Sequence, residues 1–247
     1  PTEIGKIYYE KCKTIVLELE DAENIAGLLQ SEVQGKLMIS SSVAFGRRVL
    51  TPFVLQFMGQ HPQLQVSLNL DDRYINLVEE GVDLAIRMGR LSDSSLGARF
   101  LGLNPWVIVA TPEYLEKNGT PSIPSDLTKH IALIYSSVQG DHRWQFTGRD
   151  GSNKSIQVSG PLYSNNLSTL LAATRNHLGI SALPWYVAYS SVQSRHLKPL
   201  LADWSLPAQE IHAVFSSPRL VPTKVSILID WLAGQFRGNW WTQEIGS

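Results

Sequence analysis

Short polar residues and an arginine follow several apolar stretches of this chain. The stretch "KLMIS" leads to Ser41 and Ser42, "LQVSLNL" leads to Asp71, and "VDLAIRMG" contains Arg87 near its end. Free backbone N–H groups and short side chains at the start of a helix bind carboxylates and other anions. An arginine can bind a carboxylate through two parallel hydrogen bonds. This combination of residue types indicates a ligand-binding site.

A second group of polar and aromatic residues occurs later in the sequence. Its members end or follow "HIALIY", lie between that stretch and "KSIQVSGPLYS", or follow "KSIQVSGPLYS" and "LGISALP". The residues are Tyr135, Ser136, Trp144, Asn165, Asn166 and Trp185. A few hydrogen-bonding groups among aromatic surfaces suit a small organic acid or aromatic metabolite rather than a polymer. We expect Ser42 and Asn165 to hydrogen-bond such a ligand from opposite walls of a cleft.

Structural roles remain possible for the same residues. The serines and asparagines could serve only as helix caps, which accept hydrogen bonds from N–H groups of the first helical turn. Arg87 could form an ion pair with an acid such as Asp71, Asp72 or Asp93. The sequence leaves both alternatives open.

The sequence carries no catalytic signature. It contains no GxSxG, GxxxxGKS/T, GxGxxG or HExxH pattern. The six histidines are scattered without the spacing of metal ligands. We therefore expect neither an enzyme nor a metal site, and no cofactor.

Composition describes an ordinary globular protein. Of the 247 residues 43% are hydrophobic and 17% are charged, and no apolar run is long enough for a membrane span. The net charge of −1 argues against strong nucleic-acid binding by this polypeptide alone. A single cysteine, Cys12, excludes an intrachain disulfide and fits a reducing compartment.

From Gly35 onward, the chain alternates between strand and helix patterns. Residues 64–70, 74–81 and 82–88 read as strand, crossover helix and strand, which predicts a parallel pair of strands. In "TPEYLEKNG", Thr111 is an expected helix cap and Gly119 the expected end. The repeated β-α-β order predicts an α/β fold of two open sheets, with ligands at the carboxyl ends of the strands.

Residues 1–34 form a different pattern, a narrow apolar stripe spaced alternately by four and three residues. The stripe comprises Tyr8, Cys12, Ile15, Leu19, Ala22, Ala26, Leu29 and Val33. This spacing is that of the a and d positions of a coiled coil. It favours a long helix that dimerises, although a helix packed on its own domain is the alternative.

Four parts of the sequence match a known family in the order in which that family has them. They are residues 1–68 and the stretches "EEGVDLAIRMGRLSDSSLGARFLG", "VIVATPEYLEKNGTPSIPSDLTKH" and "LLAATRNHLGISALP". Together they resemble LysR-type transcriptional regulators, from the end of the DNA-binding wing through the linker helix into the effector-binding domain. The resemblance covers essentially the whole chain. One departure is His177, which stands where the family usually has a glycine.

The resemblance implies two Rossmann-like subdomains of periplasmic-binding-protein (type 2) architecture, preceded by the linker helix. We expect residues 1–34 to form that helix, 35–111 with 208–247 to form subdomain I, and 112–207 to form subdomain II. The family also implies a small-molecule effector in the cleft, a homodimer or homotetramer, and a cytoplasmic location. It implies DNA contact through an N-terminal winged helix-turn-helix that we expect to be missing from this sequence.

The runner-up interpretation is a solute-binding protein of a transport system, which shares the two-lobed fold. A transport receptor works as a monomer and has no use for a dimerisation helix. The stripe in residues 1–34 therefore favours the regulator. Neither interpretation names the effector.

Overall fold

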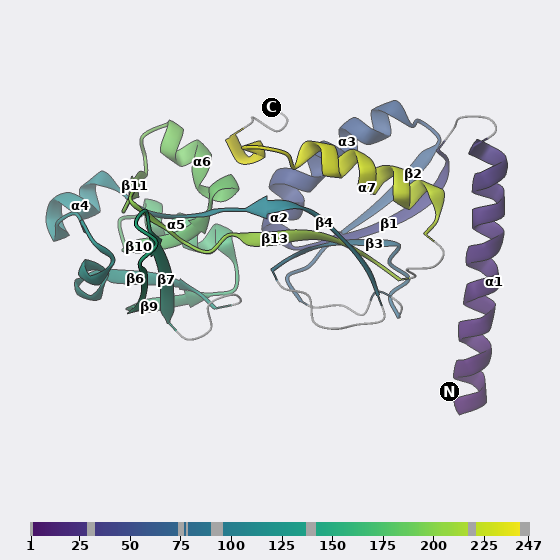
Figure 1. Ribbon diagram of the computed structural model, residues 1–247, viewed down its shortest axis with the longest axis horizontal. Coiled ribbons are helices and arrows are strands. Elements are labelled where there is room, and N and C mark those ends of the chain that lie inside the picture. Colours follow the sequence, from purple (N-terminus) through teal and green to yellow (C-terminus); the bar gives the residue numbers. More distant parts are fainter. Residues whose placement is uncertain are drawn as a thin grey trace.

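The computed structural model describes residues 2–28, 33–73, 77, 79–89, 96–136, 142–216 and 221–242. Helix α1 (Glu3–Leu28) stands beside two mixed α/β regions that follow each other along the long axis (Figure 1). No described helix combines the length and the apolar character needed to cross a membrane.

Helix α1 exposes much of its apolar surface. Ile4, Tyr8 and Ile15 are 80%, 72% and 63% exposed, and the helix contacts the body at α7 (Thr223–Gln235). Leu19, Ala22 and Ala26 of the predicted stripe belong to the helix, but their side chains are outside the described set, and Leu29 is outside it altogether. Val33 lies beyond the helix and packs against the first hydrophobic core, so the stripe ends earlier than predicted.

The first sheet has the order β2-β1-β3-β13-β4. Its strands are β1 (Gly35–Ser41), β2 (Leu64–Leu70), β3 (Leu84–Met88), β4 (Gly97–Asn104) and β13 (Gln209–Phe215). β1 pairs with β2 and β3 in parallel, whereas β13 is antiparallel to β3 and β4. Apolar side chains at alternate positions form one core with α3 (Thr51–Gln60) and α7.

The predicted strand–helix–strand unit needs two corrections. β2 and β3 are parallel, but β1 lies between them, so they are not neighbours. Leu77 and residues 79–81 form a turn, and the rest of the predicted helix lies outside the described residues. Two carboxylates, Glu79 and Glu80, would face the negative end of a helix here, which disfavours it.

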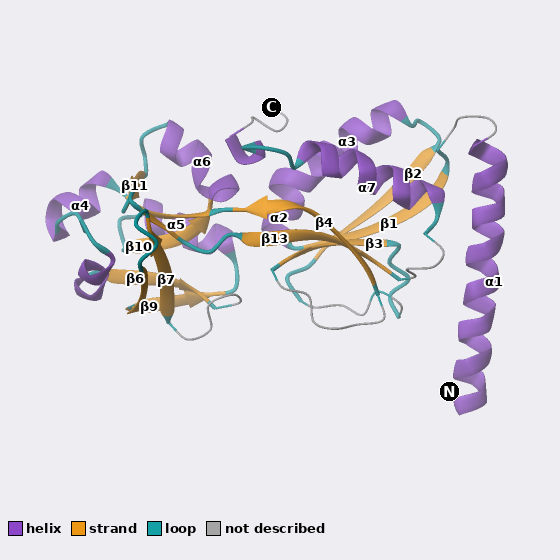
Figure 2. Ribbon diagram, in the orientation of Figure 1, coloured by secondary structure: helices purple, strands orange, loops and turns teal. Residues whose placement is uncertain are grey.

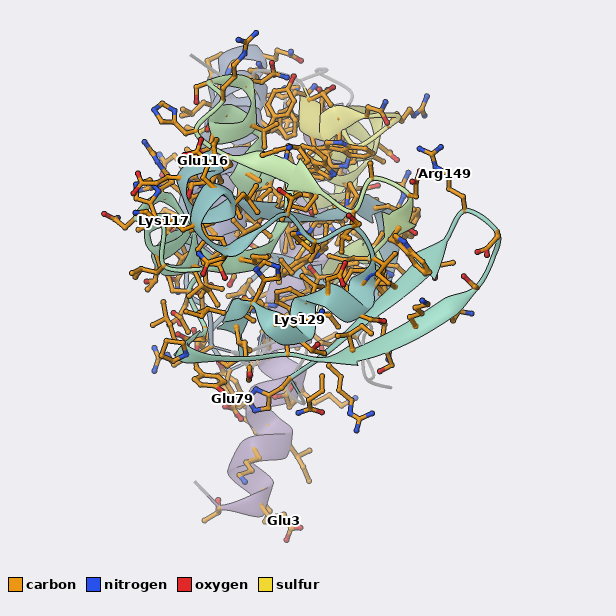
Figure 3. The ribbon with its side chains drawn as sticks, turned by 90° about the vertical axis from the view of Figure 1, so that its left-hand side faces the viewer. Glu3, Glu79, Glu116, Lys117, Lys129 and Arg149 are labelled. Atoms are coloured by element: carbon orange, nitrogen blue, oxygen red, sulfur yellow. The ribbon has the colours of Figure 1, made fainter. Side chains whose placement is uncertain are left out.

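The second sheet has the order β11-β5-β10-β6-β9, and a three-stranded sheet β12-β7-β8 accompanies it. The strands are β5 (Trp106–Ala110), β6 (Ile131–Tyr135), β7 (Arg143–Gly148), β8 (Asn153–Gln157), β9 (Ser159–Ser164), β10 (Ile180–Pro184), β11 (Lys198–Leu200) and β12 (Trp204–Ser205). The helices are α4 (Pro112–Asn118), the 3-10 turn η2 (Pro124–Lys129), α5 (Leu167–Arg175) and α6 (Trp185–Gln193). In Figure 3 the β7–β8 hairpin projects sideways, with Arg149 near its tip.

The chain crosses between the sheets at residue 105 and again at 206–208. We call residues 35–104 and 209–242 the first lobe, and residues 106–205 the second lobe. The sequence division after residue 111 put β5 in subdomain I, whereas β5 pairs with β10 and β11 of the second sheet. Strand periodicity does not reveal which sheet a strand joins, because that depends on long-range pairing. Figure 2 shows the two lobes side by side, each with strands and helices of its own.

Candidate functional site

Ser41 closes β1 at the carboxyl end of the first sheet. It is 0% exposed, and its backbone oxygen accepts a hydrogen bond of 3.0 Å from the N–H of Asp71, which follows β2. Its hydroxyl oxygen is buried and has no hydrogen-bond partner among the described residues. A buried hydroxyl without a partner is costly, which makes Ser41 a candidate for ligand contact.

Ser42 precedes a short helix, α2 (Val43–Phe45), but its side chain does not cap it. The carboxylate of Asp72 accepts the hydrogen bond from the Val43 N–H instead, at 2.9 Å. The sequence indicated Asp72 only as a possible cap of a following helix or as an ion-pair partner of Arg87. Its contact with Val43 could not be predicted, because the two residues are 29 positions apart. The Ser42 hydroxyl is therefore not needed to start the helix.

Asp71 and Arg87, both predicted site residues, have structural contacts. The Arg73 guanidinium donates to the Asp71 carboxylate at 2.7 Å, and its hydrogen bonds lower the pKa of Asp71 to about 2. Arg87 adds only a small attraction to this shift, and its Nη2 donates a long hydrogen bond of 3.4 Å to Ser40 Oγ. Asp71 is thus bound mainly by its neighbour in sequence rather than by Arg87.

The second lobe contributes a wall in which the polar residues are bound to one another. The Ser136 N–H donates to the backbone oxygen of Ser164 at 3.0 Å, and the Asn166 N–H donates to Ser164 Oγ at 3.0 Å. The Asn166 side chain accepts from the N–H groups of Ser168 and Thr169, so it caps α5. Asn165, next to it, is exposed.

The predicted aromatic residues have different surroundings. Trp144 is 2% exposed inside the core of the second lobe, so it does not line the end of the sheet as expected. Its place in β7, which pairs with β8 and β12, could not be read from sequence spacing. Trp185 is half-buried at the start of α6, and the Tyr135 ring lies 5.8 Å from that of Trp106.

Tyr186, which the sequence interpretation missed, joins the two lobes. Its ring lies edge-on to Phe45 at 5.4 Å and stacks near Trp240 of the 3-10 turn η3 (Trp240–Thr242) at 6.3 Å. Burial raises the pKa of its hydroxyl well above the usual range, and the charges of Tyr135 and Asp72 raise it further. Residues of both lobes therefore affect the pKa of the Tyr186 hydroxyl. The sequence could have pointed to Tyr186, because its position in "LPWY" directly follows an apolar stretch that forms a buried strand.

A second junction lies where the lobes exchange strands. Gln209 Oε1 accepts hydrogen bonds from Trp106 Nε1 at 2.8 Å and from Asn104 Nδ2 at 3.2 Å. The two crossing segments are thereby tied side by side. The other Asn104 side-chain atom, Oδ1, is buried without a partner among the described residues.

A cavity of about 470 Å³ lies elsewhere, at the amino ends of β1 and β2. Its lining includes Lys36, Met38, Gln65, Asp83 and Lys224. It is therefore at the opposite end of the first sheet from Ser41 and does not coincide with the predicted site. Within the described part of the chain, no group of three or more His, Cys, Asp or Glu could hold a metal ion.

Comparison with known proteins gives consistent matches. A family model described as the LysR substrate binding domain matches residues 30–237. An uncharacterized HTH-type transcriptional regulator of Haemophilus influenzae is 34% identical over 92% of this chain and 78% of its own length. The HTH-type transcriptional regulator DmlR of Escherichia coli is 32% identical over 95% of this chain and 76% of its own.

A solved structure agrees with these matches. CrgA, a LysR-type transcriptional regulator from Neisseria meningitidis, is 28% identical with a TM-score of 0.74, covering 96% of this chain and 80% of that one. These matches give no support to the transport-receptor alternative.

Proposed function

This chain belongs to the LysR substrate-binding domain family, and on that premise we propose how it recognises its effector. It is the effector-sensing region of a LysR-type transcriptional regulator. We propose that it binds a small organic acid or aromatic metabolite between the two lobes, at the carboxyl ends of β1 and β2. It acts by binding and not by catalysis, as expected of a relative of transcriptional regulators.

The Ser41 hydroxyl is the observation that carries this proposal. It is fully buried, and no described residue satisfies it. Native structures rarely leave such groups unbonded, because the lost hydrogen bonds to water cost about 1–3 kcal/mol. A ligand that hydrogen-bonds Ser41, with Ser42 beside it, would recover that free energy.

The second wall would complete the site from the other lobe. The charges of Asp72 in the first lobe and Tyr135 in the second lobe both affect the pKa of the Tyr186 hydroxyl. A molecule bound beside this hydroxyl would therefore lie between the lobes. We propose that the two lobes act as subdomains whose angle the effector sets. Binding can shift that angle only if the effector has a higher affinity for one arrangement than for the other.

Serine-to-alanine variants test the site. The probes are a panel of aliphatic and aromatic carboxylic acids, titrated by calorimetry into the folded protein. Ser41→Ala and Ser42→Ala should each weaken the best probe by about 0.5–3 kcal/mol. Ser155→Ala, on the exposed face of the β7–β8 hairpin, is the control. Undiminished affinity in both site variants would overturn the proposed site.

We further propose a homodimer or homotetramer assembled through α1. The exposed apolar residues Ile4, Tyr8 and Ile15 support this, because a solvated helix gains nothing from such side chains. Ile15→Asp would place a charge in the apolar interface at a cost of several kcal/mol. Sedimentation equilibrium should show weaker self-association, and an unchanged oligomer would contradict the role of α1.

DNA contact and location complete the proposal. A regulator of transcription acts on DNA, so we propose a cytoplasmic protein that reaches DNA through an N-terminal winged helix-turn-helix outside these 247 residues. The net charge of −1 supports this division of labour. Specific binding of an operator by these residues alone, at physiological salt, would contradict it.

A further inference from the structure

The helix that leaves the carboxyl end of β1 contains a π turn. Residues Gly46–Leu50 form the turn, called η1, between α2 and α3. The N–H of Thr51 donates to the Gly46 carbonyl, and the Thr51 hydroxyl donates to the same oxygen at 2.8 Å. Such turns are rare and occur often at functional sites, because the extra residue redirects the side chains around it.

Gly46, the first residue of the turn, packs closely against the end of β2. A Cβ atom built on Gly46 would lie 2.2 Å from a methyl carbon of Leu70, the last residue of β2. A side chain at Gly46 would therefore require the Leu70 side chain or the helix to shift. The π turn is held against the end of β2, where Asp71 and Asp72 begin the proposed site.

Arg48 is the charged residue that the turn carries inward. Its side chain is half-buried, and its Nε is buried without a hydrogen-bond partner. No hydrogen bond or ion pair joins its guanidinium to another described residue. Arg47, the preceding residue, is exposed. The two arginines therefore differ in solvation although they are adjacent.

Among the described residues, no carboxylate offsets the burial of the Arg48 guanidinium. Burial lowers the pKa of its guanidinium, and the neighbouring charge of Arg47 lowers it further. The group with an opposing effect is the hydroxyl of Tyr186, which is neutral at ordinary pH. Asp72, the acid near Tyr186, already accepts the hydrogen bond of Val43. An arginine cannot escape this cost by losing its proton, so an anion is the natural partner.

Geometry links Arg48 to the interface between the lobes. Phe45, one turn earlier on the same helix, contacts the Tyr186 ring at 5.4 Å. The π turn also packs against α6, which carries Tyr186. We propose that Arg48 is the residue that recognises the charge of the effector, binding a carboxylate group between its guanidinium and the Tyr186 hydroxyl. This inference rests on the proposed effector site and narrows the effector to a carboxylate.

A structural role for Arg48 makes the opposite prediction for stability. If the charge of Arg48 stabilises the fold itself, Arg48→Met should lower the melting temperature. If the charge is buried for a ligand, Arg48→Met relieves an unfavourable burial and should keep or raise the melting temperature. The same variant should lose affinity for carboxylates. Opposite signs in the two measurements therefore identify a ligand-binding arginine.

The experiment uses matched charged and neutral probes at constant ionic strength. Benzoate and malonate are compared with benzamide and malonamide by calorimetry and thermal unfolding. Wild-type protein should bind one of the carboxylates at least tenfold more tightly than its amide. Arg48→Met should lower that affinity at least tenfold, whereas Arg48→Lys should lose less, since lysine keeps the charge but not the planar fork. Arg47→Met, which removes an exposed charge one residue away, should change affinity by less than threefold.

Each other outcome overturns the inference. It fails if the wild type does not prefer carboxylates, if Arg48→Met binds as wild type does, or if Arg47→Met loses as much affinity. If inorganic phosphate binds as tightly as the carboxylate, with the same dependence on Arg48, then Arg48 recognises anions in general and the inferred specificity for a carboxylate is wrong. Amides that bind through Ser41 but ignore Arg48 would leave the proposed function standing and remove only the charge recognition. If no probe binds any variant, both the inference and the carboxylic-acid effector fail.

Discussion

The two lobes differ in how they treat buried polar groups. The buried side-chain atoms that lack a partner among the described residues all belong to the first lobe: Ser41 Oγ, Arg48 Nε, Asn104 Oδ1 and His212 Nδ1. In the second lobe the fully buried hydroxyls of Thr174 and Ser181 bond to each other at 2.6 Å. Asn166 is likewise occupied as a helix cap.

We interpret this difference as a division between ligand recognition and structural support of the site. A buried group that is left unbonded inside the protein gains more from a ligand's hydrogen bond than a group that is already bonded. On the proposed function, the first lobe supplies most of the specific contacts, and the second lobe adds a preformed wall together with the Tyr186 hydroxyl. Four substitutions test this comparison.

The largest effect is expected in the second lobe, at its buried hydroxyl pair. Thr174→Val removes one partner and leaves Ser181, which is 0% exposed, unbonded. Urea unfolding should show a loss of about 1–3 kcal/mol. The control, Thr120→Val at an exposed position, should change stability by less than about 0.5 kcal/mol. A neutral Thr174→Val would mean that the second lobe does not depend on this bond.

The next effect is the cap of α5. Asn166→Ala removes the acceptor of the Ser168 and Thr169 N–H groups, so the free energy of unfolding should fall by about 1 kcal/mol. Asn165→Ala, its exposed neighbour, should have little effect on stability. The affinity of the best carboxylate probe should stay unchanged in Asn166→Ala, and a marked loss would make the second wall a recognition surface too.

A smaller effect of the opposite kind is expected in the first lobe. Ser41→Ala removes a hydroxyl that has no partner, so stability without ligand should be unchanged or higher by up to about 1 kcal/mol. Chemical denaturation measures this difference. A loss as large as that of Thr174→Val would show that the Ser41 hydroxyl is bonded within the protein, and the contrast between the lobes would disappear.

The smallest effect concerns Asp71 at the rim of the first lobe. Its pKa is lowered to about 2 by Arg73, so its ionised form favours the folded state above about pH 4, and that contribution disappears as the pH falls through 2. Arg73→Gln should move the pKa back towards 3.8, as followed by NMR titration of the carboxyl carbon. Because both groups reach solvent, stability at pH 7 should hardly change. An unmoved pKa would contradict the role of the Arg73 side chain and point to the backbone N–H of residue 73, which the substitution keeps.

Local patterns in the sequence were enough for most elements. Thr111 caps α4 and Gly119 follows its end, as predicted, because caps depend on residues three or four positions apart. The helical segment that follows Ser42 consists of α2, η1 and α3, and the periodicity of the sequence gives no sign of the π turn. Gly46 of that turn packs against Leu70, a contact across 24 positions that local periodicity cannot reveal.

The candidate site was less predictable for the same reason. Ser41 and Asp71 come together because parallel strands end at one edge, which the sequence implies once the fold is known. Trp144 was wrongly expected at the site, and Arg48 and Tyr186 were missed, because their surroundings depend on which distant elements pack together. The roles proposed for Ser42 and Asn165 as effector ligands stay predictions.

The tied crossing segments have a mechanical consequence. Gln209 hydrogen-bonds both Asn104 and Trp106, so the two segments that join the lobes are held together at one place. Helix α1 stands at the far end of the first lobe from this point (Figure 1). A small rotation of the lobes about this place would therefore move α1 over a longer distance than residues that lie close to it.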